Sequence, residues 1–171
     1  MLVRIALTAA LLASSGCDTL GYREKDPYAS SAPGLGPTVR VGSVVDGDTI
    51  RVMLEGRETP VRLIGIDTPE LGGSKGRGEC LGRAAERFTS SEMTGRRVTL
   101  ELDVDSLDPY ERTLAYVWKD GRLFNETLVE RGLAEERAYP PNIRHQERLR
   151  AAEDRARAAR RGIWGRCGAL P

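Results

Sequence analysis

Histidine and cysteine are scarce in this chain of 171 residues, which has one histidine, His145, and three cysteines. The sequence contains no CxxC pair and no cluster of cysteine with histidine, so it excludes the usual structural zinc sites. His145 lies near the start of the last predicted helix. A single histidine in this position predicts a structural polar contact rather than general acid chemistry.

Long apolar runs are also missing. The N-terminal run, Ile5 to Ala13, follows Arg4 and is too short to span a bilayer, so it predicts the hydrophobic region of a signal peptide. The small residues before Cys17 resemble a bacterial lipoprotein box, although Ser14 stands where such boxes usually carry leucine. We expect residues 1–16 to be removed on export and Cys17 to carry a lipid that anchors the chain to a membrane of the cell envelope. The alternative is a secreted protein whose signal peptide is cut near Ser15 or Gly16.

The chain has almost no net charge. Loss of Arg4 with the signal peptide lowers the 26 basic residues to 25, which equals the number of acidic residues. General electrostatic steering of a polyanion is therefore weak. The predicted last helix is nevertheless rich in arginine, and we interpret its basic face as solvated rather than as a dedicated contact with DNA. Its arginines are Arg144, Arg148, Arg150, Arg155, Arg157, Arg160 and Arg161.

Residues 17–37 have no apolar periodicity and many prolines, glycines and serines, which is typical of a flexible tether. Alternating apolar residues after the tether predict strands, and longer periodic segments that end near glycine predict helices. The predicted strands are 39–45, 49–54, 61–66, 97–104 and 113–118, and the predicted helices are 82–93, 124–131 and 142–161. This order is typical of an α+β fold, a five-stranded OB-fold barrel with three helices over residues 38–167.

Three acids and an arginine fall in the predicted hairpin that runs from Val45 to Glu70. Pairing about a midpoint between Arg57 and Glu58 places Asp48 opposite Asp67, where two carboxylates repel each other. A bound cation removes this repulsion, and oxygen ligands favour calcium or magnesium over zinc. The alternative is that both acids are solvated at a frayed hairpin end.

Three strings in this order resemble the staphylococcal nuclease (thermonuclease) family. They are Val45 to Thr49, Arg62 to Glu70, and Asp108 to Tyr116, and the similarity runs from about Thr38 to Trp164. The resemblance implies an endonuclease that hydrolyses phosphodiester bonds of DNA and RNA with little sequence preference and leaves 3′-phosphate ends. A non-catalytic OB-fold module that binds single-stranded nucleic acid is the alternative, although such modules tend to lose the acids and arginines present here.

The resemblance also implies the division of roles in the site. Asp48, Asp67 and the carbonyl of Thr68 would bind Ca²⁺, Glu70 would activate water, and Arg62 and Arg112 would bind the phosphate. A perfect strand would place Arg62 and Asp67 on opposite faces, so we expect Gly65 to form a bulge. The family usually has glycine at the position of Glu111 and a basic residue at that of Pro109, so Glu111 is an alternative partner for Arg112.

Four residues are predicted to bind the substrate. Lys75 and Arg77 lie in a glycine-rich segment close to Glu70, and Tyr139 matches one of two tyrosines that line the family's nucleotide pocket. The other tyrosine position is Arg137, and Tyr110 is a further candidate for stacking on a base.

With Cys17 lipidated, Cys80 and Cys167 remain as a pair. An oxidising envelope favours a disulfide between them, which would tie the C-terminal end to the start of the first predicted helix. Two free thiols are the alternative.

Overall fold

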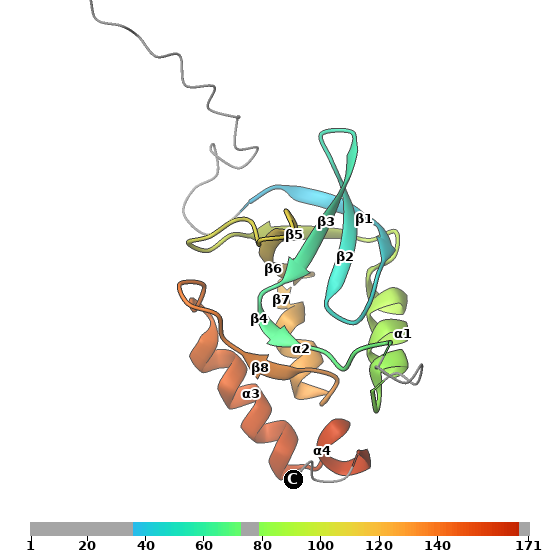
Figure 1. Ribbon diagram of the computed structural model, residues 1–171, viewed down its shortest axis with the longest axis vertical. Coiled ribbons are helices and arrows are strands. Elements are labelled where there is room, and N and C mark those ends of the chain that lie inside the picture. The colour runs from blue at the N-terminus through green and yellow to red at the C-terminus, as the bar shows by residue number, and fades with distance from the viewer. Residues whose placement is uncertain (1–35, 73–78, 168–171) are drawn as a thin grey trace, which may run out of the picture.

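The barrel is built from five strands that pair in a closed ring. The computed structural model describes residues 36–72 and 79–167 (Figure 1). The strands pair in the order β3-β2-β1-β5-β6, and a parallel pairing of β3 with β6 closes the barrel. Their bounds are β1 Thr38–Val44, β2 Thr49–Leu54, β3 Arg57–Leu63, β5 Arg97–Glu101 and β6 Thr113–Lys119, with the short β7 Arg122–Leu123 added at the edge. The predicted OB-fold barrel is confirmed.

Helices pack against the barrel and against a second, two-stranded sheet. The second sheet pairs β4 (Gly65–Asp67) with β8 (Glu135–Arg137), and in Figure 1 it lies between α1 and α3. The helices are α1 Gly82–Met93, α2 Phe124–Glu130, α3 Gln146–Ala158 and α4 Ile163–Arg166. The barrel interior is apolar, with Val41, Val52, Val61, Leu63 and Leu100 fully buried. Within the described residues, no helix has both the length and the apolar character needed to cross a membrane.

The hairpin of β2 and β3 has a tighter turn than predicted. Leu54 pairs with Arg57 and Thr49 with Arg62, which leaves Glu55 and Gly56 as a two-residue turn. Both turn residues have positive φ, 48° and 78°, as in the turns that best match the twist of paired strands. The predicted pairing of Asp48 with Asp67 is therefore wrong. The amide of Leu63 instead donates to the carbonyl of Asp48 at 2.8 Å.

The predicted strand 61–66 is divided at Gly65. This glycine has φ of 79°, and an added Cβ would lie 2.6 Å from Cδ1 of Leu149, so only glycine fits there. Asn125 fixes the break, because its amide donates to the carbonyl of Ile64 at 2.8 Å and its oxygen accepts from the amide of Val117 at 2.9 Å. A break between two strands, rather than the predicted bulge, thus turns the chain towards β8.

Two predicted elements are shorter in the structure, and their facing ends share one reason. The fourth predicted strand ends at Glu101, and the last long helix begins only at Gln146 and ends at Ala158 rather than at Arg161. Asn142 bonds the backbone of Asp105 through both its amide oxygen and its amide nitrogen, and the amide of Arg144 donates to Asp103 at 2.9 Å. These side-chain contacts hold the two segments together outside regular structure.

The predicted disulfide between Cys80 and Cys167 is present, with a Cα–Cα distance of 5.7 Å across a separation of 87 residues. A variant with Cys80→Ser and Cys167→Ser should lose about 2–5 kcal/mol of unfolding free energy, because the unfolded chain regains the entropy of an open loop. Chemical denaturation of the variant and of the wild type, with and without reductant, measures this. Superimposable unfolding curves for the oxidised wild type and the variant would contradict it.

Candidate active site

Arg62 lies between two carboxylates. Its Nη1 contacts Oδ1 of Asp48, and its Nη2 donates to Oδ1 of Asp67 at 2.8 Å and to the carbonyl of Ile66 at 3.4 Å. Asp48 is buried, with 3% of its side chain exposed, whereas 37% of the Asp67 side chain is exposed. The structure thus brings three predicted site residues together. They meet because the chain breaks at Gly65 between β3 and β4, which brings Ile66 and Asp67 within reach of Arg62, and not through the hairpin register predicted from the sequence.

Thr68 fixes the other side of Asp48. The amide and the hydroxyl of Thr68 donate to Oδ2 of Asp48 at 2.8 and 2.9 Å. A Cβ at Gly47 would lie 2.7 Å from the Thr68 hydroxyl oxygen, so this close approach requires glycine. The carbonyl of Gly47 accepts from the Thr89 hydroxyl at 2.7 Å, which connects the loop to α1. The sequence suggested only the Thr68 carbonyl as functional, and the roles of its amide and hydroxyl were missed.

Glu70 lies on the exposed segment that follows β4. Its amide donates to Oε2 of Glu79 at 3.1 Å, and its carbonyl accepts from the amide of Glu79 at 2.8 Å. Among residues 36–72 and 79–167, no side chain bonds to its carboxylate. Cys80 follows Glu79 directly, so the disulfide anchors the segment that holds Glu70.

Arg112 is held by Asp108, a residue that sequence reasoning missed. Its Nε donates to Oδ2 of Asp108 at 2.6 Å, and Oδ1 of Asp108 accepts from the amides of Tyr110 and Arg112 at 2.9 Å. Burial opposes ionisation of Asp108, but these bonds outweigh it and lower the pKa of the carboxyl. The Asp-Pro pair was the available signal, because it favours the start of a turn. Within the described residues the acidic partner of Arg112 is Asp108, and no ion pair joins Arg112 to Glu111, so the alternative pairing with Glu111 is wrong.

The loop of Arg112 leads into β6, the strand that pairs with the strand of Arg62. Thr113, the first residue of β6, pairs with Val61 of β3. Arg112 directly precedes Thr113 and Arg62 directly follows Val61, so both arginines adjoin this paired position. Glu111 has φ of 60°, a conformation that favours glycine and accounts for the family's glycine there. The loop therefore keeps a shape suited to glycine at the cost of strain at Glu111.

Among the aromatic residues in the described part of the chain, the two predicted tyrosines are the most exposed. Tyr110 is 79% exposed and Tyr139 is 61% exposed. The guanidinium carbon of Arg112 lies 5.6 Å from the centre of the Tyr110 ring. Tyr110 is thus joined to the arginine loop, whereas Tyr139 stands on a turn that Asn142 closes. Lys75, Arg77 and Cys17 lie outside the described residues.

His145 has the structural role predicted for it. Its Nε2 is 2.9 Å from Oε2 of Glu101, the oxygen that also accepts from the Trp118 indole at 2.6 Å. Its ring packs edge-on against Tyr116, with 4.5 Å between ring centres. Burial is the main cause that raises the pKa of Tyr116 to about 12. This cluster connects the start of α3 to the barrel and takes no part in the Arg62 site.

The family model for "Staphylococcal nuclease homologue" matches residues 60–166. Thermonucleases from two species match over most of their own length. The Staphylococcus intermedius protein is 40% identical over 141 residues, covering 82% of this chain and 84% of the relative, and that of Staphylococcus hyicus is 41% identical over 127 residues, covering 74% and 75%. The chain belongs to the staphylococcal nuclease family. The endonuclease YncB of Bacillus subtilis, another relative, is 33% identical over 132 residues, which cover 76% of this chain and 63% of the relative.

In this member of the nuclease family, the donor set suits a hard cation. The described residues contain no group of three or more acidic, histidine or cysteine side chains arranged around one point. They do contain two carboxylates, of Asp48 and Asp67, that converge on Arg62, and the Asp67 side chain is accessible. Carboxylate and carbonyl oxygens are the ligands that calcium prefers, so the residues fit such an ion.

Proposed function

We propose that this chain is an exported, calcium-dependent endonuclease that cleaves DNA and RNA with little sequence preference and leaves 3′-phosphate ends. It is a nuclease, a hydrolase of phosphodiester bonds, as its family and its thermonuclease and endonuclease relatives indicate. Export, the metal, the products and the substrate range are the proposed part. The observation that supports the proposed chemistry is the guanidinium of Arg62 held between Asp48 and Asp67 at the accessible end of β4.

Each predicted site residue has a chemical task in this proposal. Asp48, Asp67 and the Thr68 carbonyl would hold calcium, which supplies positive charge to a phosphate oxygen. Glu70 takes a proton from water, whose oxygen bonds to phosphorus as the bond from phosphorus to the 5′ oxygen breaks. The 5′ oxygen takes a proton from solvent water and leaves as a hydroxyl, while the phosphate stays on the 3′ side. Arg62 and Arg112 donate to the phosphate oxygens as negative charge builds on them.

Exposed rings suit the substrates named in the proposal. Bases of a single strand stack on aromatic side chains with little regard to sequence, and Tyr110 and Tyr139 present such rings. Lys75 and Arg77 are proposed to contact the phosphates. A lipid on Cys17 would hold the enzyme at the cell envelope, and secretion without the lipid is the alternative.

The deciding experiment is hydrolysis of single-stranded DNA, duplex DNA and RNA by the purified protein. Cleavage should require calcium, stop with a chelator, and resume when calcium is restored in excess. The 3′ ends of the products should accept a label only after a phosphatase has removed their phosphate. Tight binding of the same strands without cleavage, at any calcium concentration, would instead identify a binding module.

Asp48→Asn should abolish calcium-dependent cleavage, with kcat/KM falling at least about a hundredfold. The amide keeps the shape of the side chain but removes the charge that Arg62 and a cation share. Calorimetric titration of calcium, together with the cleavage rate, measures both effects. Asp154→Asn, at an exposed acid of α3, is the matched control. Calcium affinity equal to that of the wild type in Asp48→Asn would contradict the assignment.

A further inference from the structure

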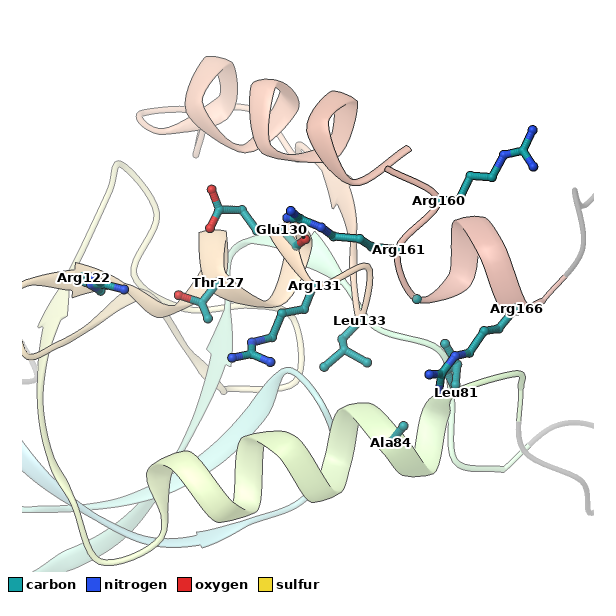
Figure 2. Close-up of a pocket in the computed structure, with 11 residues that line it drawn as sticks. Leu81, Ala84, Arg122, Thr127, Glu130, Arg131, Leu133, Arg160, Arg161 and Arg166 are labelled. Carbon is teal, nitrogen blue, oxygen red and sulfur yellow. Dashed lines mark hydrogen bonds between the residues drawn. The ribbon is translucent and has the colours of Figure 1, made fainter. Parts of the chain in front are cut away.

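Five arginines line a cleft that contains none of the predicted site residues. The cleft has a volume of about 690 Å³ and lies between α1, the C-terminal end of α2 and α4 (Figure 2). Its arginines are Arg122, Arg131, Arg160, Arg161 and Arg166, and its other lining residues include Leu81, Ala84, Thr127 and Leu133. We name this surface the arginine cleft.

The charge of the arginine cleft is not compensated. All five arginines are exposed, and none forms an ion pair with a carboxylate within the described part of the chain. The single lining carboxylate, Glu130, is already bound by Nη2 of Arg155 at 2.6 Å. On α3, by contrast, Arg148 and Arg157 each pair with a glutamate. The cleft therefore gathers five exposed guanidinium groups that have no carboxylate partner in the described structure.

The walls of the arginine cleft are held rigidly in place. Gly132 and the turn before α4 are in close contact, because the amide of Ile163 donates to the Gly132 carbonyl at 2.9 Å. A Cβ on Gly132 would lie 2.2 Å from the carbonyl oxygen of Arg161. The disulfide joins the two walls, since Cys80 precedes Leu81 and Cys167 follows Arg166. The cleft is thus a preformed surface.

The arrangement of the side chains suits an extended ligand. Figure 2 shows Arg122 and Arg166 towards opposite ends of the cleft, with Arg131 between them, while the side chain of Arg160 points outward. Arg131 also covers the Phe88 ring at 4.5 Å, so this aromatic face is occupied. Separated guanidinium groups without a lining aromatic ring match a row of phosphates and offer nothing that reads or stacks a base.

We propose that the arginine cleft is a second binding surface for the sugar–phosphate backbone of nucleic acid, apart from the site where the bond is cleaved. It retains long strands while the Arg62 site acts on them, a role in turnover that rests on the proposed function. Leu81 of the cleft lies two residues after Glu79, which bonds the backbone of Glu70. The cleft therefore begins close in sequence to the residue that bonds Glu70, and one long strand is proposed to contact both sites.

The test is a variant with Arg122→Gln, Arg131→Gln and Arg166→Gln, titrated with a labelled 30-nucleotide single strand in chelator, so that no turnover is needed. Affinity should fall at least about tenfold, and the slope of log K against log salt should shrink by about 2, since each neutralised phosphate contributes about 0.7. A trinucleotide should bind the variant and the wild type equally. Lysine at the same three positions should restore the slope.

Controls separate this surface from general charge and from misfolding. Glutamine at Arg57, Arg97 and Arg150, three exposed arginines outside the cleft, removes the same charge and should leave the 30-nucleotide affinity close to that of the wild type. If the triple cleft variant does not fold, Arg122→Gln with Arg166→Gln replaces it, because neither side chain forms an ion pair within residues 36–72 and 79–167. About two thirds of the slope change is then expected.

Three outcomes would overturn the proposal. The first is an unchanged salt slope in the folded cleft variant, and the second is an equal loss of affinity for the 30-nucleotide strand in the control variant. The third is a cleft variant that loses binding only to vesicles that contain phosphatidylglycerol. The last outcome would assign the cleft to a membrane surface. Failure of the proposed function would appear separately, as a wild type that binds the long strand and does not cleave it.

Discussion

Replacement of Arg62 by lysine should lower kcat/KM on DNA by about a hundredfold to a thousandfold, which corresponds to roughly 3–4 kcal/mol in the barrier. The planar guanidinium uses two nitrogens, Nη1 and Nη2, to reach Asp48 and Asp67 at once. An ammonium group is a single point and cannot reproduce this fork, nor the paired donors that a phosphate would receive. Arginine geometry, and not charge alone, is therefore the expected requirement.

The measurement is steady-state cleavage of one defined strand at saturating calcium, with thermal unfolding recorded for each protein. Arg51→Lys is the matched control, because Arg51 lies on the neighbouring strand β2 and pairs with Glu58 at 3.8 Å near the surface. It should retain nearly full activity. An Arg62→Lys enzyme within about threefold of the wild type would show that the charge alone suffices, contrary to the role of a transition-state donor.

The bounds of several elements could be predicted because local patterns determine them. β2 and α1 have the predicted limits, since alternation defines the strand and an amphipathic segment that ends near Gly95 defines the helix. The register of the hairpin could not be predicted in the same way. It depends on Glu55 adopting a positive φ of 48°, a conformation that glutamate rarely adopts. A turn of only two residues was therefore not expected here.

The candidate site shows the same division between local and distant causes. Asp48, Arg62 and Asp67 were predicted from their motifs, and the structure places them in contact. The hydroxyl contact of Thr68 with Asp48 depends on the break at Gly65 and on β8, which pairs with β4 from 70 residues away in the sequence. No local pattern signals such a contact.

The predicted disulfide connects stability with the candidate active site. Cys80 lies beside Glu79, whose amide and carboxylate bond the backbone of Glu70. A bridge that closes an 87-residue loop thus also limits the motion of the segment that carries the proposed general base. Positioning of this kind matters for proton transfer, which requires hydrogen-bond distances between the base and the water.

Replacement of Glu70 by glutamine should therefore lower kcat by about a hundredfold to a ten-thousandfold, while calcium affinity stays unchanged. The amide cannot accept the proton of the attacking water, and general base catalysis contributes about this factor. The backbone bonds of residue 70 to Glu79 do not involve the side chain of Glu70, so the segment keeps its position. The loss should appear in kcat rather than in KM.

Glu79→Gln provides the matched control, since the glutamine oxygen can still accept from the amide of Glu70 and the same charge is removed nearby. It should change kcat by less than about threefold. Single-turnover cleavage and calcium titration of both variants separate the chemical step from metal binding. Equal rates for Glu70→Gln and Glu79→Gln would place the base elsewhere. A loss of calcium affinity in Glu70→Gln alone would make Glu70 a ligand of the ion and not the acceptor of the proton.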